Sequence, residues 1–158
     1  MANIFSASEI AEIGIQIEKN GSDFYEVLAK QSKSKKAQDI FGYLKEQEQE
    51  HVVVFQKILD TVNKYEPKEA FPQEYFAYMN ALASNYVFTQ KDKGRQIAKS
   101  VKSDKEAISL GLGFEKDSVV FYEGMKKAVP ADQHDTLDKL IMQEKDHIRQ
   151  LHELEGGI

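Results

Sequence analysis

Two stretches of the chain, SASEIAEIGIQIEKNGSDFYE at 6–26 and SDKEAISLGLGFEKDSVVFYE at 103–123, carry one pattern 97 positions apart. They share Ser, Glu, Gly, Glu-Lys and Phe-Tyr-Glu in register. Each is followed by a Glu-x-x-His motif, which places Glu48 with His51 and Glu144 with His147. The repeat therefore predicts two similar halves, each with a single glutamate followed by a Glu-x-x-His pair.

Helix signals accompany both copies of the pattern. Each opens with Ser-x-x-Glu, at Ser6 and at Ser103, and this spacing is typical of a capping box at the start of a helix. Glu18 and Glu115 each lie 12 residues after the capping serine. At about 1.5 Å of rise per residue, both glutamates are expected near the middle of their helices.

The Glu-x-x-His motifs lie on predicted amphipathic helices. We expect the first of these helices to start at 34–36 and to run to about Val62, and the second to start after Pro130 and to end before Gly156. Each apolar stripe is interrupted only by its glutamate and its histidine. The stripes consist of Phe41, Leu44, Glu48, His51, Phe55 and Leu59, and of Leu137, Leu140, Glu144, His147, Leu151 and Leu154.

Short links within each half and a long link between the halves predict the architecture. Two antiparallel hairpins, at 6–62 and 103–155, are joined by a crossover at 63–102 that contains Pro67, Pro72 and one expected short helix. A long crossover between two hairpins is typical of ferritin-like four-helix bundles. We therefore expect an all-α fold in a single domain over 1–158.

Six residues of the repeat form a typical set of metal ligands. Residues three apart share a helix face, so the two Glu-x-x-His pairs can each present one carboxylate and one imidazole to a metal ion. Glu18 and Glu115 complete a set of four carboxylates and two imidazoles, which suits a carboxylate-bridged pair of divalent iron or manganese ions. Two divalent cations would also balance four buried negative charges. The predicted ligands are Glu18, Glu48, His51, Glu115, Glu144 and His147.

Two further pairs of repeat residues lie near the predicted ligands. Tyr25 and Tyr122 follow Glu18 and Glu115 by two helical turns, so their hydroxyls could hydrogen-bond ligand carboxylates; the alternative is an ordinary amphipathic core position. Gly14 and Gly111 precede the same glutamates by four residues. They either leave room beside the metals or allow close helix packing.

Composition excludes several classes of function. The chain has 158 residues, a net charge of -5 and no cysteine, which argues against nucleic-acid binding, thiol catalysis and Cys-ligated zinc or iron–sulfur sites. The N-terminal residues show no basic region followed by an apolar run, and no segment approaches the roughly 18 uninterrupted apolar residues of a membrane span. We therefore expect a soluble, cytoplasmic protein without a membrane partner.

The six ligand positions and the Glu-Lys-x-x-x-x-Phe-Tyr motifs resemble the rubrerythrin branch of the ferritin-like superfamily over essentially the whole chain. The resemblance implies a non-haem diiron centre, a homodimer, and reduction of hydrogen peroxide or reaction with dioxygen in oxidative-stress defence. Full-length rubrerythrins carry a rubredoxin domain with four cysteines, which this chain lacks, so an external electron donor such as a rubredoxin-like protein is implied. The family's extra glutamate, three residues before the third-helix ligand, is replaced by Leu112.

Three functions follow as alternatives. The first is a rubrerythrin-type diiron oxidoreductase that reduces peroxide or dioxygen. The second is iron or manganese handling at the same site, with a manganese or mixed-metal centre and no substrate turnover. The third is a structural or regulatory bundle whose ligands no longer bind metal. The spacing of the ligands defines neither the metal nor the reductant.

Overall fold

The computed structural model describes residues 4, 6–64 and 71–157, and its regular elements are all helical. They follow the order α1 (Ala7–Gln31), α2 (Lys35–Lys64), α3 (Gln73–Asn85), η1 (Val87–Thr89), α4 (Lys93–Ser100), α5 (Asp104–Met125), η2 (Lys126–Ala128), η3 (Ala131–Gln133) and α6 (His134–Gly156). The predicted all-α fold is confirmed within this part of the chain. None of its helices is both long and apolar enough to cross a membrane.

Both repeat helices begin where the capping serines predict. The Ser6 hydroxyl accepts a hydrogen bond of 3.2 Å from the amide of Glu9, and the Ser103 hydroxyl accepts one of 3.1 Å from the amide of Glu106. Each bond satisfies an amide that has no partner inside its own helix. The repeat therefore fixes α1 and α5 at equivalent starting points, and this register places their glutamates at matching depths.

The two predicted apolar stripes form the buried faces of α2 and α6. α2 begins at Lys35, inside the predicted window, while α6 continues through Gly156, one residue beyond its predicted end. Three-residue and eight-residue links, at 32–34 and 126–133, return the chain in the antiparallel direction within each half. The glutamate and histidine that interrupt each stripe therefore point into the bundle with the apolar residues.

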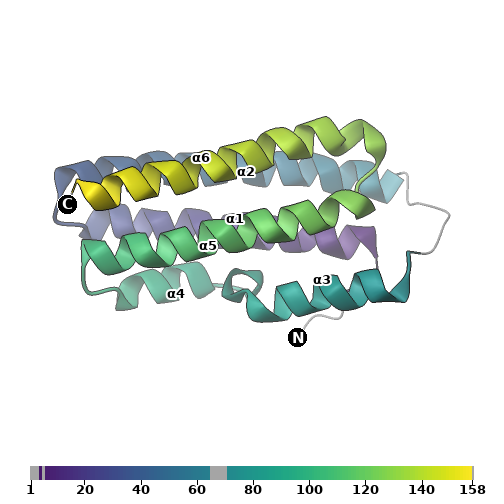
Figure 1. Ribbon diagram of the computed structural model, residues 1–158, viewed down its shortest axis with the longest axis horizontal. Helices are drawn as coiled ribbons and strands as arrows, with labels where there is room; N and C mark the ends of the chain where they lie inside the picture. The colour runs from purple at the N-terminus through teal and green to yellow at the C-terminus, as the bar shows by residue number, and fades with distance from the viewer. Residues whose placement is uncertain (1–3, 5, 65–70, 158) are drawn as a thin grey trace.

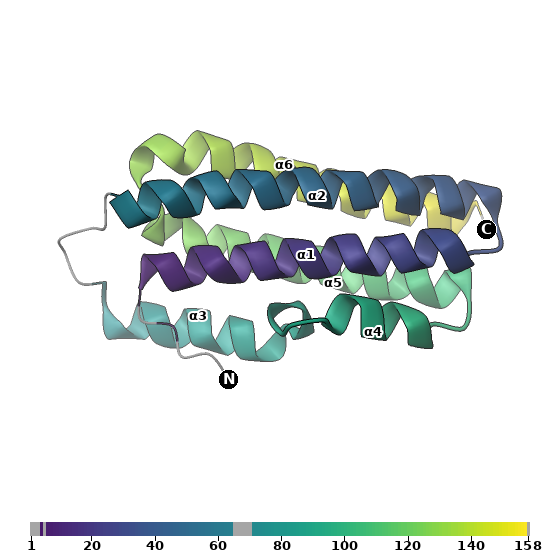
Figure 2. The ribbon, with the colours of Figure 1, turned by 180° about the vertical axis from the view of Figure 1, so that it is seen from behind.

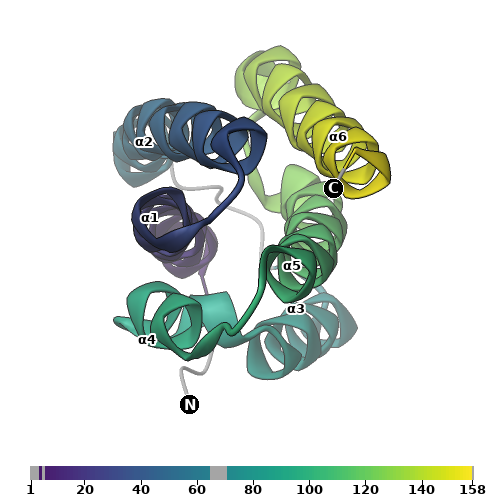
Figure 3. The ribbon, with the colours of Figure 1, turned by 90° about the vertical axis from the view of Figure 1, so that its left-hand side faces the viewer.

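Figures 1 and 3 show how the helices are layered. α2 and α6 form one layer, α1 and α5 form the next, and α3 and α4 lie on the far side of α1 and α5. α1 packs along α2 and α5 packs along α6, while α4 packs on α1 and α3 packs on α5. The crossover thus covers one face of the four-helix bundle.

The crossover contains one more helix than the sequence predicted. Besides α3 it holds the short helix α4, which lies alongside α1 when the molecule is seen from behind (Figure 2). The sequence gave no sign of this helix, because the run at 91–95 is polar and the buried residues of α4 are only Gly94 and Ala98. Two small residues do not make an apolar stripe. The part of the predicted crossover at 65–70, including Pro67, lies outside the described residues.

Asn20 attaches the crossover to α1. Its amide nitrogen donates to the carbonyl oxygens of Phe88 and Gln90, both at 2.6 Å, and its amide oxygen accepts from the Gly94 amide at 2.9 Å. Gly94 also packs directly against the backbone of α1, where an added Cβ would overlap the backbone carbonyl oxygen of Asn20. The crossover is therefore fixed to α1 two residues after the predicted ligand Glu18.

Candidate metal centre

The six residues predicted as ligands meet at the centre of the bundle. α1 contributes Glu18 and α5 contributes Glu115, while α2 and α6 each contribute one Glu-x-x-His pair. Each of the six residues is at most 3% exposed. Burial of four carboxylates at this depth is costly unless positive charge or hydrogen-bond donors compensate them.

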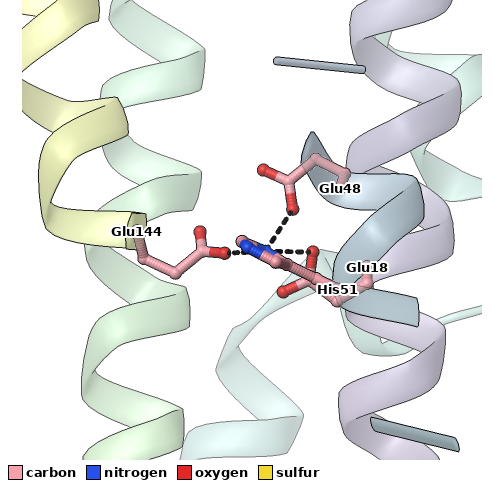
Figure 4. Close-up of side chains that lie close together, drawn as sticks. All are labelled: Glu18, Glu48, His51 and Glu144. Atoms are coloured by element: carbon pink, nitrogen blue, oxygen red, sulfur yellow. Dashed lines mark ion pairs between the residues drawn. The ribbon is translucent and has the colours of Figure 1, made fainter. Parts of the chain in front are cut away.

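The first group of ligand atoms surrounds His51 (Figure 4). Its Nδ1 atom lies 3.5 Å from Glu18 Oε2, 3.6 Å from Glu48 Oε2 and 2.6 Å from Glu144 Oε1. Three carboxylates, supplied by α1, α2 and α6, thus converge on one imidazole nitrogen.

The second group surrounds His147. Its Nδ1 atom lies 3.4 Å from Glu48 Oε1, 3.5 Å from Glu115 Oε1 and 3.7 Å from Glu144 Oε2. Glu48 and Glu144 therefore belong to both groups, and each turns one oxygen toward each histidine. This is the arrangement of two bridging carboxylates between a pair of ion positions, with Glu18 and Glu115 at the outer ends.

Unpartnered polar atoms show that the groups fit metal ions. Apart from the ion-pair contacts within the two groups, five buried atoms among the six residues have no hydrogen-bond partner: Glu18 Oε2, His51 Nδ1, Glu115 Oε2, Glu144 Oε1 and His147 Nδ1. Two ligand atoms that share an ion at about 2.1 Å are about 3 to 3.5 Å apart, close to most of the separations observed here. Buried polar groups without partners are rare, and a bound cation would give all five atoms a partner.

The electrostatics of the metal-free centre also indicate a site that fits cations. Burial, together with the charge of Glu144, raises the pKa of Glu115 to about 7. Burial and the charge of Glu48 raise the pKa of Glu18. Burial alone would lower the pKa of His51, but the charge of Glu18 and the surrounding carboxylates raise it. Without metal, the centre therefore takes up protons to offset its negative charge.

Two tyrosine hydroxyls hold the outer carboxylates, as the sequence suggested. Tyr25 on α1 donates to Glu115 Oε1 at 2.7 Å, and Tyr122 on α5 donates to Glu18 Oε1 at 2.6 Å. Each tyrosine thus orients the glutamate of the opposite helix and not the one on its own. The second oxygen of each glutamate, Oε2, is left without a hydrogen-bond partner.

The glycines separate into packing and site positions. At Gly14 an added Cβ would meet the Phe55 ring at 2.9 Å, so the packing interpretation describes this glycine. At Gly111 it would meet Leu151 at 3.2 Å and the Tyr25 hydroxyl at 3.5 Å, so this glycine lies both in the packing and beside the centre. Gly21, which the sequence analysis did not select, lies where a missing side chain leaves room beside the metal centre, the role that was considered for Gly14. Its added Cβ would stand 3.3 Å from the carboxylate carbon of Glu48.

The sequence analysis also missed a small cavity between the carboxylates and the crossover. It has room on the order of one water molecule and is lined by Ile17, Gly21, Tyr25, Glu48, Tyr86, Phe88, Phe114, Glu115 and Ser118. The buried hydroxyl of Tyr86 is 2.8 Å from the Ser118 hydroxyl and donates to the Phe114 carbonyl at 2.9 Å. Both residues belong to the lining of the cavity.

A helical bundle with a long crossover and two buried carboxylate–histidine groups defines the ferritin-like class. The chain belongs to the Rubrerythrin family, whose sequence profile matches residues 9–155. A crystal structure from Thermotoga maritima, provisionally assigned as a ferritin-like diiron-carboxylate protein, is similar with a TM-score of 0.75 and 25% identity. The similarity covers 98% of this chain and 97% of that one. A search of curated proteins found no match.

Proposed function

We propose that this chain is a diiron oxidoreductase that reduces hydrogen peroxide or dioxygen with electrons from an external donor. The observation that carries the proposal is the pair of bridging glutamates, each of which turns one oxygen toward each histidine. Membership of the Rubrerythrin family and the likeness to a ferritin-like diiron-carboxylate protein support it. The proposed ligands are Glu18, Glu48, His51, Glu115, Glu144 and His147.

Two ferrous ions would supply the two electrons that, with two protons, convert hydrogen peroxide into two molecules of water. The chain provides the geometry for this reaction. Four helices hold the carboxylates and imidazoles, and the hydroxyls of Tyr25 and Tyr122 fix the outer glutamates. Because all six ligands are buried, bulk water is excluded from the centre.

The size of the cavity supports a small substrate. Pockets for organic ligands typically enclose about 300–1,000 Å³, whereas the space beside Glu48 and Glu115 holds about one water-sized molecule. Dioxygen and hydrogen peroxide contain only two heavy atoms each. We therefore place the oxidant on the crossover side of the centre, beside Gly21, where the missing side chain leaves Glu48 accessible.

The source of electrons and the assembly are part of the same proposal. The 158 residues contain no cysteine with which to bind a rubredoxin-type iron, and a rubredoxin-like protein is the electron donor that the family resemblance suggests. The same resemblance suggests a homodimer, and the sequence pattern is the basis on which we propose a cytoplasmic location.

The test combines metal analysis with spectroscopy of the purified protein. We expect close to two irons per chain, and a ferric visible absorption that develops when the reduced protein receives one equivalent of hydrogen peroxide. His51→Ala/His147→Ala should lose iron, whereas His152→Ala, at an exposed position outside the centre, should retain it. Reaction no faster than that of free ferrous iron would overturn the proposed activity.

Leu112 favours metal handling as a second candidate function. It stands where the resemblance places an additional carboxylate ligand, and its side chain packs against the hydrophobic core. Iron or manganese could then be bound and released without turnover of a substrate. Full loading with two ions per chain, combined with no peroxide consumption in the presence of a reductant, would favour this candidate.

A further inference from the structure

Both ligand motifs are preceded by glutamine, at Gln47 and at Gln143, but the structure uses the two glutamines differently. Gln143 reaches across from α6, and its Oε1 lies 2.8 Å from the Nε2 of His51 on α2. Gln47 holds the matching place on α2. Among the described residues, however, no hydrogen bond joins it to the Nε2 of His147.

The contact of Gln143 fixes which nitrogen of the His51 ring faces the centre. An amide oxygen can only accept a hydrogen bond, so the Nε2 of His51 carries a proton and donates it to Gln143. The other nitrogen, Nδ1, faces the three carboxylates of the first group and is the atom that would bind an ion. The opposite amide orientation would place the proton on Nδ1, where it would block metal binding, so ligation itself selects the arrangement with Oε1 toward the ring.

We infer that Gln143 is a positioning residue for His51, and that it makes two metal positions of nearly equivalent sequence unequal in affinity. This inference depends on the proposed metal centre. At the first position, around His51, the imidazole is held in its binding orientation, with Nδ1 toward the carboxylates and Nε2 toward Gln143, before the ion arrives. At the second position, around His147, the ring must adopt that state on binding, so the ion is held more weakly.

The magnitude of the effect can be anticipated. Partners that hydrogen-bond the far nitrogen of a ligating histidine typically change metal affinity by about 10- to 100-fold when they are removed. Gln143 is exposed at the surface of the bundle, so we expect the lower end of that range, about tenfold. Its exposure also means that its replacement leaves the core intact.

Cadmium-113 NMR of the cadmium-loaded protein can separate the two positions. We expect two resonances and, in a chelator titration, unequal affinities. Gln143→Met keeps the length of the side chain and removes the amide, so one resonance should shift and that position should lose about tenfold in affinity. Gln47→Met, the matched control, should leave both resonances in place. Gln143→Glu restores an acceptor and should restore the affinity.

The possible failures are distinguishable. Equal changes in Gln143→Met and Gln47→Met, or no change in either, would overturn the positioning role while the metal centre remained intact. A wild-type protein that binds no cadmium, iron or zinc would overturn the metal centre itself, and with it this inference. The melting temperature of the metal-free variants should match that of the wild type, which separates positioning from a structural role.

Discussion

At the scale of single residues, the two tyrosines connect the halves of the centre crosswise. Tyr25 and Glu18 lie on the same helix, yet Tyr25 bonds Glu115 and leaves Glu18 to Tyr122. A shift of α1 against α5 would therefore disturb both hydroxyl bonds at once. The tyrosines couple the spacing of these two helices to the orientation of the outer carboxylates.

The bond of each tyrosine to the glutamate of the opposite helix can be tested with a double-mutant cycle. Tyr25→Phe should weaken metal binding by about tenfold, because Glu115 loses the partner that orients it. Combined with Glu115→Gln, it should add little further loss, whereas combined with Glu18→Gln the losses should add. Affinities measured by competition with a chelator give the coupling. Equal coupling of Tyr25 to both glutamates would contradict the crossed arrangement.

Gly21 allows a second prediction at this scale. Gly21→Ala places a methyl group 3.3 Å from the carboxylate carbon of Glu48, so this side chain must shift by a few tenths of an ångström. Because Glu48 contributes to both groups, we expect weaker binding of both ions. Gly42→Ala is the control, since an added Cβ there meets nothing within 4 Å. That change should stabilise α2 by up to about 1 kcal/mol.

Elemental analysis of the Gly21→Ala and Gly42→Ala proteins tests this prediction. Their melting temperatures check that both variants fold. A fully loaded Gly21→Ala protein would mean that Glu48 adapts without loss of ligation, and the space beside it would then have no role in binding.

At the scale of secondary-structure elements, the attachment of the crossover depends on Asn20. Asn20→Ala would leave two carbonyl oxygens and the Gly94 amide without their partner in a buried region. At about 1–3 kcal/mol for each unsatisfied group, we expect a loss of about 3 kcal/mol or more in the free energy of unfolding. The repeat-matched position on α5 is the exposed Asp117, and Asp117→Ala should change stability by less than about 0.5 kcal/mol.

Urea unfolding of the metal-free proteins checks both values. Similar midpoints for Asn20→Ala and the wild type would show that the crossover is held by packing alone. Protection of η1 and α4 amides from hydrogen exchange should fall in the same variant, because these elements would open more often.

The elements themselves were largely predictable because local signals marked them. Ser6 and Ser103 identified two helix starts, and the apolar stripes of α2 and α6 identified two buried faces. α4 was missed because it has only eight residues and touches α1 through glycine and alanine. Its attachment to α1 includes a distant side chain, Asn20, whose role cannot be inferred from the sequence of α4 alone.

At the scale of the whole molecule, the repeat explains why the candidate ligands could be selected from the sequence and their surroundings could not. Equivalent halves bring equivalent residues to one centre, so spacing alone selected the six residues that the structure brings together. The surroundings of the site depend on contacts between different elements. Gln143 on α6 contacts His51 on α2, Gly21 on α1 lies against Glu48 on α2, and Tyr86 in the crossover lines the cavity. Their roles depend on how far neighbouring helices are rotated, and the linear spacing of residues does not contain that information.

The buried charges of the whole centre predict how the stability of the metal-free protein depends on pH. In the metal-free protein the pKa of Glu115 is about 7, against an ordinary value of 4.5 in the unfolded chain. The folded state therefore binds more protons, and the stability contributed by protonated Glu115 is complete below about pH 4.5 and lost as pH rises through about 7. The raised pKa values of His51 and His147 act with the same sign above their ordinary value of 6.5.

The metal-free protein should consequently become less stable from pH 5 to pH 8, while the metal-loaded protein should show the opposite trend. Metal binding displaces protons from the carboxylates and imidazoles, so affinity rises with pH and adds to the stability of the folded state. Urea midpoints at pH 5.5, 6.5 and 7.5, with and without zinc, measure both slopes. Glu115→Gln cannot release a proton and should flatten the metal-free slope. A metal-free midpoint that rises with pH would contradict the raised pKa values, because the unfolded chain would then bind more protons than the folded protein.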